Sequence, residues 1–208
     1  MITKFLNNTE EPGRSMVEMI GVLAIVGVLS IGGISGFSKA MAKYKLDKTL
    51  NQISMIITSV HTIFGDQYSY AGLTTPRAVT YNIVGDDLSH GTSGDNTVLT
   101  NAYNGNVTIQ AVTTSEGTTN CNVTDDNSIN TTYCPFFKLT YTGLPQQACI
   151  EISMSDWGGK ANSNLFSIKA NDTLFTWDGD NKIPVSFSAA SAACNKRDDT
   201  NNLIWIYQ

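Results

Sequence analysis

The sequence predicts an α+β fold: a long N-terminal helix whose second half packs against an antiparallel β-sheet. Residues 19–38 contain no charged side chain, and residues 46–64 repeat apolar side chains at helical spacing. Residues 66–208 instead hold short β-prone runs separated by Gly, Asn, Asp and Pro. We therefore expect one helix to serve both an apolar environment and a β-rich head.

The apolar run at residues 19–38 is long enough to cross a bilayer. Twenty helical residues span about 30 Å, the thickness of the hydrocarbon layer. A secretory signal peptide cut after Ala42 is the alternative, but its apolar core is usually only about 7–15 residues long. Lys39 also lies inside that cleavage region. We therefore favour a transmembrane helix.

One carboxylate, Glu18, lies at the start of this apolar run. An unpaired carboxylate in hydrocarbon costs several kcal/mol, so it needs a partner or a place at the interface near the helix N-terminus. Gly13 precedes Glu18 at a distance that resembles the type IV prepilin signal of the class III type. That resemblance implies a peptidase cut between Gly13 and Arg14 and methylation of the Arg14 amine. It also makes Glu18 the fifth mature residue.

The resemblance further implies a role for Glu18 in assembly. Its carboxylate would pair with the Arg14 amine of a neighbouring subunit, which neutralises both charges and sets the axial register. Arg14 departs from the Phe, Met or Leu that is usual at the first mature position. The leader, which carries Lys4 against Glu10 and Glu11, is also less basic than usual.

The stretches "RSMVEMIGVLAIVGVLSIGG", "SKAMAKYK" and "GLPQQACIEISMSDWG" resemble type IVb pilins, including thin-pilus-like major subunits. The resemblance implies a pilin fold and a homo-oligomeric helical filament for adhesion, aggregation or conjugation. The implied partners are the prepilin peptidase and the inner-membrane assembly machinery. The precursor would lie in the bacterial inner membrane with its head in the periplasm, and the product would be an extracellular fimbrium. The expected parts are a leader (1–13), a membrane or filament-core helix (14–38), an amphipathic continuation (39–65) and a β-rich head (66–208).

Two alternatives share parts of this pattern. A minor pilin or a type II secretion pseudopilin would have the same N-terminus, and a secreted or membrane-anchored β-rich binding domain would share the head. The positive-inside tendency also opposes the expected orientation, because it places the lysines at residues 39–48 in the cytoplasm.

Glycines interrupt the apolar helix. Gly32 and Gly36 form a GxxxG pattern, which allows close helix packing and could also mark a simple dimer face. Together with Gly33 they make this the stretch of lowest helix propensity. We expect any local unwinding in a filament to fall here.

The second half of the helix carries a single apolar stripe. Largely off this stripe fall Asp47, Lys48, Asn51, Gln52 and Ser54. His61, beside the stripe, is expected to be a surface or hydrogen-bonded histidine and not a ligand. Gly65 is the expected terminator. The stripe consists of Leu46, Leu50, Ile53, Ile57, Val60 and Phe64.

Four cysteines without CxxC spacing, far in sequence from both histidines, favour two disulfides over zinc and indicate an oxidising compartment. We expect sequential pairing, Cys121 with Cys134 and Cys149 with Cys194, worth about 3 and about 4 kcal/mol.

The head sequence suggests seven strands and one segment, residues 144–154, that is either a short helix or a strand. The expected strands are 78–84, 106–112, 136–142, 165–170, 173–177, 182–187 and 203–207.

The composition argues against other functions. A net charge of −5 does not favour nucleic-acid binding. We find no catalytic motif and expect no enzyme activity, no cofactor and no metal. The acidic turn with Asp178 and Asp180 departs from the EF-hand pattern at Lys182.

Overall fold

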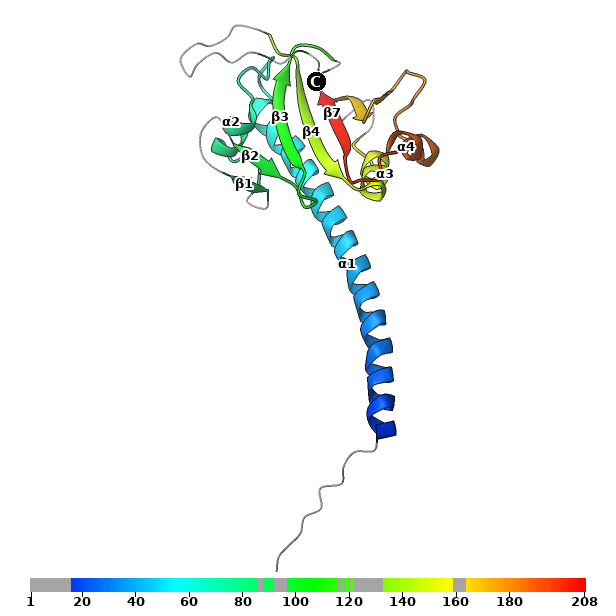
Figure 1. The fold of residues 1–208 in the computed structure, drawn as a ribbon. Coiled ribbons are helices and arrows are strands. Elements are labelled where there is room, and N and C mark those ends of the chain that lie inside the picture. The colour runs from blue at the N-terminus through cyan, green and yellow to red at the C-terminus, as the bar shows by residue number, and fades with distance from the viewer. Residues whose placement is uncertain are drawn as a thin grey trace, which may run out of the picture. The chain divides into compact units, whose positions relative to one another are not determined.

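The computed structural model describes residues 16–85, 88–91, 97–115, 117, 119, 121, 133–158 and 164–208 (Figure 1). The chain divides into two compact units, an N-terminal unit (Met1–Lys43) and a head unit (Tyr44–Gln208). The helices are α1 (Met16–Phe64), α2 (Thr75–Thr80), α3 (Gln146–Met154) and α4 (Phe187–Ala193). The strands are β1 (Ser89–Gly91), β2 (Val98–Thr100), β3 (Asn106–Val112), β4 (Phe136–Leu144), β5 (Leu165–Ala170), β6 (Thr173–Thr176) and β7 (Asn201–Tyr207).

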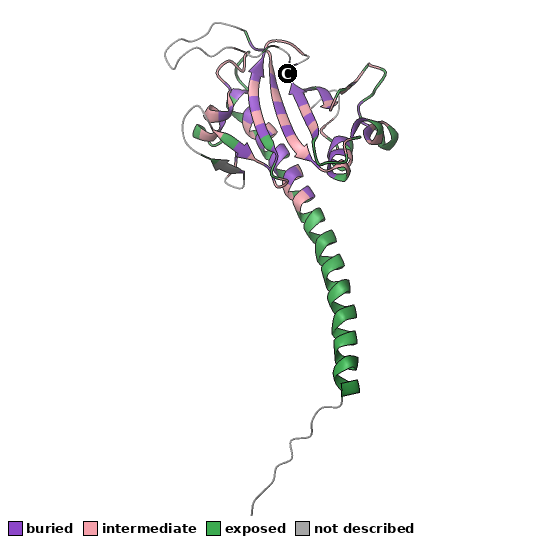
Figure 2. Cartoon of the chain, in the orientation of Figure 1, coloured by how far each residue is buried: buried purple, intermediate pink, exposed green. Residues whose placement is uncertain are grey.

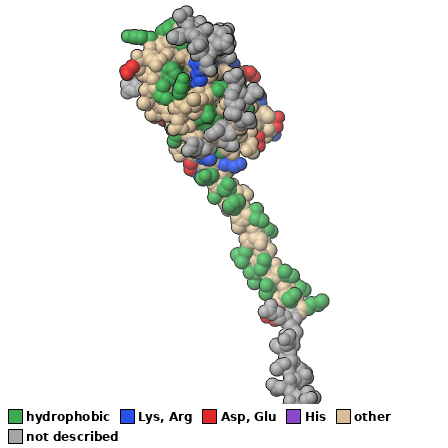
Figure 3. Space-filling view, turned by 90° about the vertical axis from the view of Figure 1, so that its left-hand side faces the viewer, with side chains coloured by type: hydrophobic (Ala, Val, Ile, Leu, Met, Phe, Trp, Pro, Cys, Tyr) green, Lys and Arg blue, Asp and Glu red, His purple; other side chains and the backbone are tan. Residues whose placement is uncertain are grey.

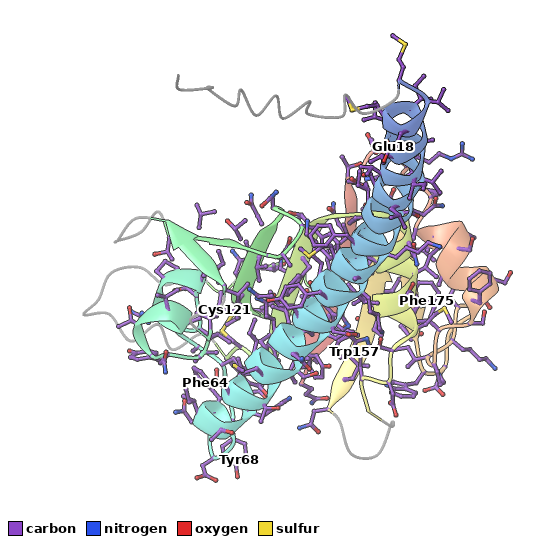
Figure 4. All side chains as sticks on the ribbon, turned by 90° about the horizontal axis from the view of Figure 1, so that it is seen from below. Glu18, Phe64, Tyr68, Cys121, Trp157 and Phe175 are labelled. Atoms are coloured by element: carbon purple, nitrogen blue, oxygen red, sulfur yellow. A yellow bond between two sulfur atoms is a disulfide. The ribbon has the colours of Figure 1, made fainter. Side chains whose placement is uncertain are left out.

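In the head unit, α1 lies against one face of the sheet (Figures 1 and 4). The expected stripe is buried at four of its six positions and half-buried at Leu50 and Ile57. The buried face is wider than the stripe, because Thr49, Gln52 and Ile56 are buried too. Of the five polar residues expected largely off the stripe, Gln52 is buried, so the expectation was wrong at this one position. The helix ends at Phe64, directly before the expected terminator Gly65.

The seven strands form one antiparallel sheet in the order β1-β2-β3-β4-β7-β5-β6. The last strand of the chain, β7, is thus a central strand between β4 and β5. Its alternate residues pair with β4 so that Leu139 faces Trp205 and Phe137 faces Tyr207. All four side chains are buried. Burial of alternate residues on β3, β4 and β7 forms the apolar face that receives α1.

The expected strands at 106–112 and 165–170 coincide with β3 and β5, and those at 136–142, 173–177 and 203–207 overlap β4, β6 and β7. The ambiguous segment 144–154 contains helix α3. The sequence pattern did not indicate β1 and β2, which have only three residues each.

Two predicted strands were wrong, and the reason is helix capping. The run 78–84 begins inside α2, where the Thr74 side chain accepts a hydrogen bond from the Arg77 amide and Pro76 lies in the first turn. In the run 182–187 only Lys182 makes an isolated bridge, and Phe187 begins α4 behind the Ser186 cap. Local cap chemistry therefore outweighed β-propensity at both places.

The turn between β2 and β3 requires a glycine. A Cβ on Gly105 would overlap the Thr142 carbonyl group of β4, so any other residue would push this turn away from β4. The Asn101 side chain closes the same turn, donating to the Thr142 carbonyl at 2.9 Å and accepting from the amides of Tyr103 and Gly105.

A second buried asparagine connects the end of β4 with the start of β7. The Asn201 side chain is fully buried, and its Nδ2 donates to the carbonyl oxygens of Leu144 (3.1 Å) and Lys196 (2.7 Å). Its Oδ1 accepts from the Lys196 amide (3.1 Å) and from Asn171 Nδ2 (2.9 Å). Every polar atom of this side chain is therefore paired, and its loss would leave several buried groups unpaired.

We predict that Asn201→Ala lowers the free energy of unfolding by about 3 kcal/mol, because buried donors and acceptors lose their partners. Denaturant titration of the full chain in detergent micelles measures this change. The matched control is Asn195→Ala at an exposed position, which should change stability by less than about 0.5 kcal/mol. Equal effects of the two substitutions would contradict the prediction.

Candidate functional site: the faces of helix α1

The N-terminal unit exposes an apolar helix along its whole described length. Every residue from Met16 to Tyr44 is exposed, including the large apolar side chains (Figures 2 and 3). By length and composition α1 contains a stretch that can cross a membrane. Apolar surface on this scale marks a membrane or protein interaction site. The helix therefore requires lipid or other protein around it.

Two of the three serines within the apolar stretch are paired locally. The Ser30 hydroxyl donates to the Val26 carbonyl at 2.7 Å, and the Ser38 hydroxyl donates to the Ile34 carbonyl at 3.0 Å. Each of these two hydroxyls is thus hydrogen-bonded within its own helix and needs no partner from another molecule. Ser30 and Ser38 therefore do not oppose burial in hydrocarbon.

Glu18 lies in the first turn of α1, where the helix dipole favours a carboxylate (Figure 4). It is exposed, so a neighbouring molecule can reach it. Gly13 and Arg14 lie outside the described residues. The expected cleavage, methylation and pairing with Glu18 thus remain predictions.

The three glycines at positions 32, 33 and 36 lie within a continuous helix in this single chain. A Cβ added at Gly32, Gly33 or Gly36 would meet nothing within 4 Å. Close approach of another helix is therefore possible here without rearrangement. The expected unwinding concerns a filament and stays a prediction.

Both disulfides lie in the head unit, and the structure joins Cys121 to Cys134 and Cys149 to Cys194. The second bond ties α3 to the residue that ends α4. The first bond closes a loop held at both ends. The Cys121 amide donates to the Ala111 carbonyl of β3, and the Cys134 carbonyl accepts from the Tyr70 amide.

An aromatic cluster, which the sequence did not indicate, fixes α1 on the sheet. The His61 ring meets Phe137 (5.5 Å) and Tyr207 (5.7 Å) edge-on, and the Phe137 and Tyr207 rings stack at 5.2 Å. Trp157 meets Trp205 edge-on at 5.3 Å. The four aromatic partners come from β4, β7 and the segment after α3, so only the folded chain brings them together.

His61 differs from the expected hydrogen-bonded or surface histidine. It is half-buried, and its Nε2 atom has no hydrogen-bond partner among the described residues. Burial lowers the pKa of His61 below 6.5, because a charged imidazolium would lose hydration against apolar rings. Burial also raises the pKa of the neighbouring Tyr207, which keeps that phenol neutral.

The described residues show little that is typical of a catalytic or metal-binding site. They contain no group of three or more His, Cys, Asp or Glu side chains that could hold a metal ion. An open groove of about 530 Å³ runs past His61, Trp157 and Tyr207. Its lining is mainly aromatic, apolar and hydroxyl-bearing, without a paired acid and base. The large exposed feature of the molecule is therefore the apolar helix.

A family model described as PilS N terminal matches residues 43–208. The chain belongs to the PilS family of type IVb pilins. The match covers the head unit, whose fold is the pilin fold expected from the sequence.

Two curated relatives extend the similarity over nearly the whole chain. Both are described as the major structural subunit of bundle-forming pilus, one from Escherichia coli O111:H- and one from Escherichia coli O127:H6 (strain E2348/69 / EPEC). Each is 21% identical over 211 residues, covering 99% of this chain and 99% of the relative. The crystal structure of a type IVb pilin from Salmonella typhi is similar in fold. It has a TM-score of 0.51 and 18% identity over 76% of this chain and 97% of that one.

We predict that the head unit loses stability as the pH falls below 6.5. The unfolded chain then protonates His61, while the folded chain resists protonation until the lower folded-state pKa is reached. Stability is therefore fully present above the unfolded pKa and falls as the pH drops through the folded pKa. The melting temperature of the full chain, measured at several values between about pH 7.5 and about pH 5, would report this decline in stability.

The matched variants for this test are His61→Gln and His90→Gln, since these are the chain's two histidines. His61→Gln should flatten the decline in melting temperature, and His90→Gln should preserve it. If His61→Gln left the pH profile unchanged, burial of this imidazole would not be its cause.

Proposed function

We propose that this chain is the structural subunit of a type IV pilus that polymerises through its apolar helix. The carrying observation is the uninterrupted apolar exposure of α1 in the N-terminal unit, which requires a covering partner. A bilayer supplies that cover before assembly, and the helices of other copies supply it in the filament. Family membership and the two relatives described as major structural subunits support this proposal.

The precursor is held in the inner membrane by residues 16–38, with its head in the periplasm. The prepilin peptidase cuts between Gly13 and Arg14 and methylates the new amine, and the inner-membrane assembly machinery then moves the subunit into an extracellular filament. The two disulfides of the head unit support an oxidising, exported location. The role we propose for such a fibre is adhesion, aggregation or conjugative contact.

Glu18 sets the register between neighbours in this proposal. Moving a subunit from the bilayer into the filament core buries its N-terminal amine, which costs several kcal/mol unless the charge is paired. The carboxylate of a neighbour's Glu18 is the pairing group. A neighbour displaced by one turn would leave both charges buried and unpaired, so correct stacking is favoured over shifted stacking.

The mass of the mature chain tests the proposal. We expect intact-protein mass spectrometry of sheared filaments to give a chain that begins at Arg14, carries one additional methyl group and retains both disulfides. A chain beginning at Met1 or Lys43 would contradict it and favour a membrane-anchored or secreted binding domain. This chain should also be the principal component of the filaments, since a minor pilin or pseudopilin would be scarce.

We predict that Glu18→Ala leaves cleavage intact and reduces the yield of filaments at least about tenfold, as the loss of more than about 1.4 kcal/mol per contact implies. Glu18→Gln should fail similarly, since an amide cannot neutralise an amine, whereas Glu18→Asp should retain part of the yield. Quantification of sheared filaments and of cleaved membrane-bound subunit separates assembly from processing.

The control for this test is Glu151→Ala, which removes an exposed carboxylate from the head unit. It should assemble at the normal level. Normal filaments from cleaved Glu18→Ala would rule out the register role while leaving the pilus-subunit proposal in place.

A further inference from the structure

Positive charge is concentrated immediately after the apolar stretch of α1. Residues 39–48 hold four lysines and one aspartate, a net charge of +3, whereas residues 49–208 hold seven basic and fourteen acidic residues. The chain as a whole has a net charge of −5. We call the four lysines the lysine collar. They are Lys39, Lys43, Lys45 and Lys48.

The collar surrounds the helix instead of forming one stripe. At about 100° and 1.5 Å per residue, the four side chains point to several sides of α1 within about 14 Å of its length. All four are exposed or half-buried. A stripe would suit a flat partner lying along the helix, whereas a ring suits a helix that passes through a charged layer.

Helix geometry directs the collar toward the apolar stretch. The Cα–Cβ bonds of an α-helix tilt toward its N-terminus, which here is the apolar side. Long lysine side chains can therefore reach back and place their ammonium groups at the level of the lipid headgroups. Tyr44, which is 60% exposed within the same stretch, is of a residue type enriched at membrane interfaces.

We propose that the lysine collar binds the anionic headgroups of phospholipids in the leaflet on the head side of the membrane. The inference rests on the proposed function, because it uses the orientation given there. It assigns a partner to lysines that the positive-inside tendency would place on the opposite side. Anionic lipid would hold the subunit at a fixed depth, with Glu18 near the other interface, until assembly removes it.

Lys45 has a competing contact. Its Nζ lies 5.8 Å from the centre of the Tyr103 ring in the head unit, a cation–π arrangement. Burial raises the pKa of Tyr103 to about 12, and the nearby carboxylates of Glu151 and Asp47 add to the shift, so this phenol stays neutral. The test below leaves this contact between Lys45 and Tyr103 intact and changes Lys39, Lys43 and Lys48.

The experiment measures lipid selectivity around the full chain in phosphatidylcholine bilayers. Electron paramagnetic resonance compares the association of spin-labelled phosphatidylglycerol and spin-labelled phosphatidylcholine. We expect phosphatidylglycerol to be preferred about fivefold, the factor that corresponds to about 1 kcal/mol for one lysine near an anionic surface. The triple substitution K39Q/K43Q/K48Q should bring the ratio close to one, and high salt should weaken the preference of the unsubstituted chain.

Two control variants distinguish the collar from charge in general. K169Q/K182Q/R197Q removes the same charge from the rest of the head unit and should keep the preference. K39R/K43R/K48R keeps the charge and should keep the preference too. If K39Q/K43Q/K48Q fails to insert into the bilayer, these two control variants and the salt titration still test the inference.

An unsubstituted chain without preference for phosphatidylglycerol would overturn the inference, and so would an equal loss in the control K169Q/K182Q/R197Q. The measurement requires neither cleavage nor filament formation. A chain that shows the preference but begins at a residue other than Arg14 would refute the proposed processing and leave lipid binding intact. The converse result would refute lipid binding alone.

Discussion

One helix has to satisfy two different environments, and the rest of the structure depends on how it does so. In the head unit, Ile53 and Val60 of α1 are fully buried against the sheet. In the N-terminal unit, side chains such as Leu23 and Leu29 are more than 60% exposed. The first requirement is met within the chain. The second cannot be met by a monomer in water, because exposed apolar area is unfavourable in proportion to its size. Membrane insertion and polymerisation are two ways of meeting it with the same surface.

The head unit packs its part of α1 against one face of the sheet. The last strand, β7, lies in the middle of the sheet, so the sheet is complete only when the whole chain has folded. Aromatic rings from β4 and β7 then contact α1, while one disulfide joins α3 to the end of α4 and the other joins Cys121 to Cys134. Strand order and aromatic packing both restrain the head-unit part of α1.

The parts of this arrangement that depend on local pattern could be predicted from the sequence. The apolar run, the period of the stripe, the end of α1 before Gly65 and strand β3 all follow from residues close together in the chain. Contacts across long sequence separations could not be predicted. The bond from Asn201 to Leu144 spans 57 residues, and the rings around His61 come from β4 and β7. Neither contact is marked by a spacing pattern in the sequence. Helices α2 and α4 were not predicted, because helix capping outweighed the β-propensity of their residues.

The central claim is that the apolar part of α1 exchanges lipid for copies of itself. A filament structure determined by electron cryomicroscopy tests it most directly. The account predicts that residues 16–38 of successive subunits pack together around the filament axis, out of contact with water. A filament of this chain in which those residues face solvent, or are missing from the mature subunit, would contradict it.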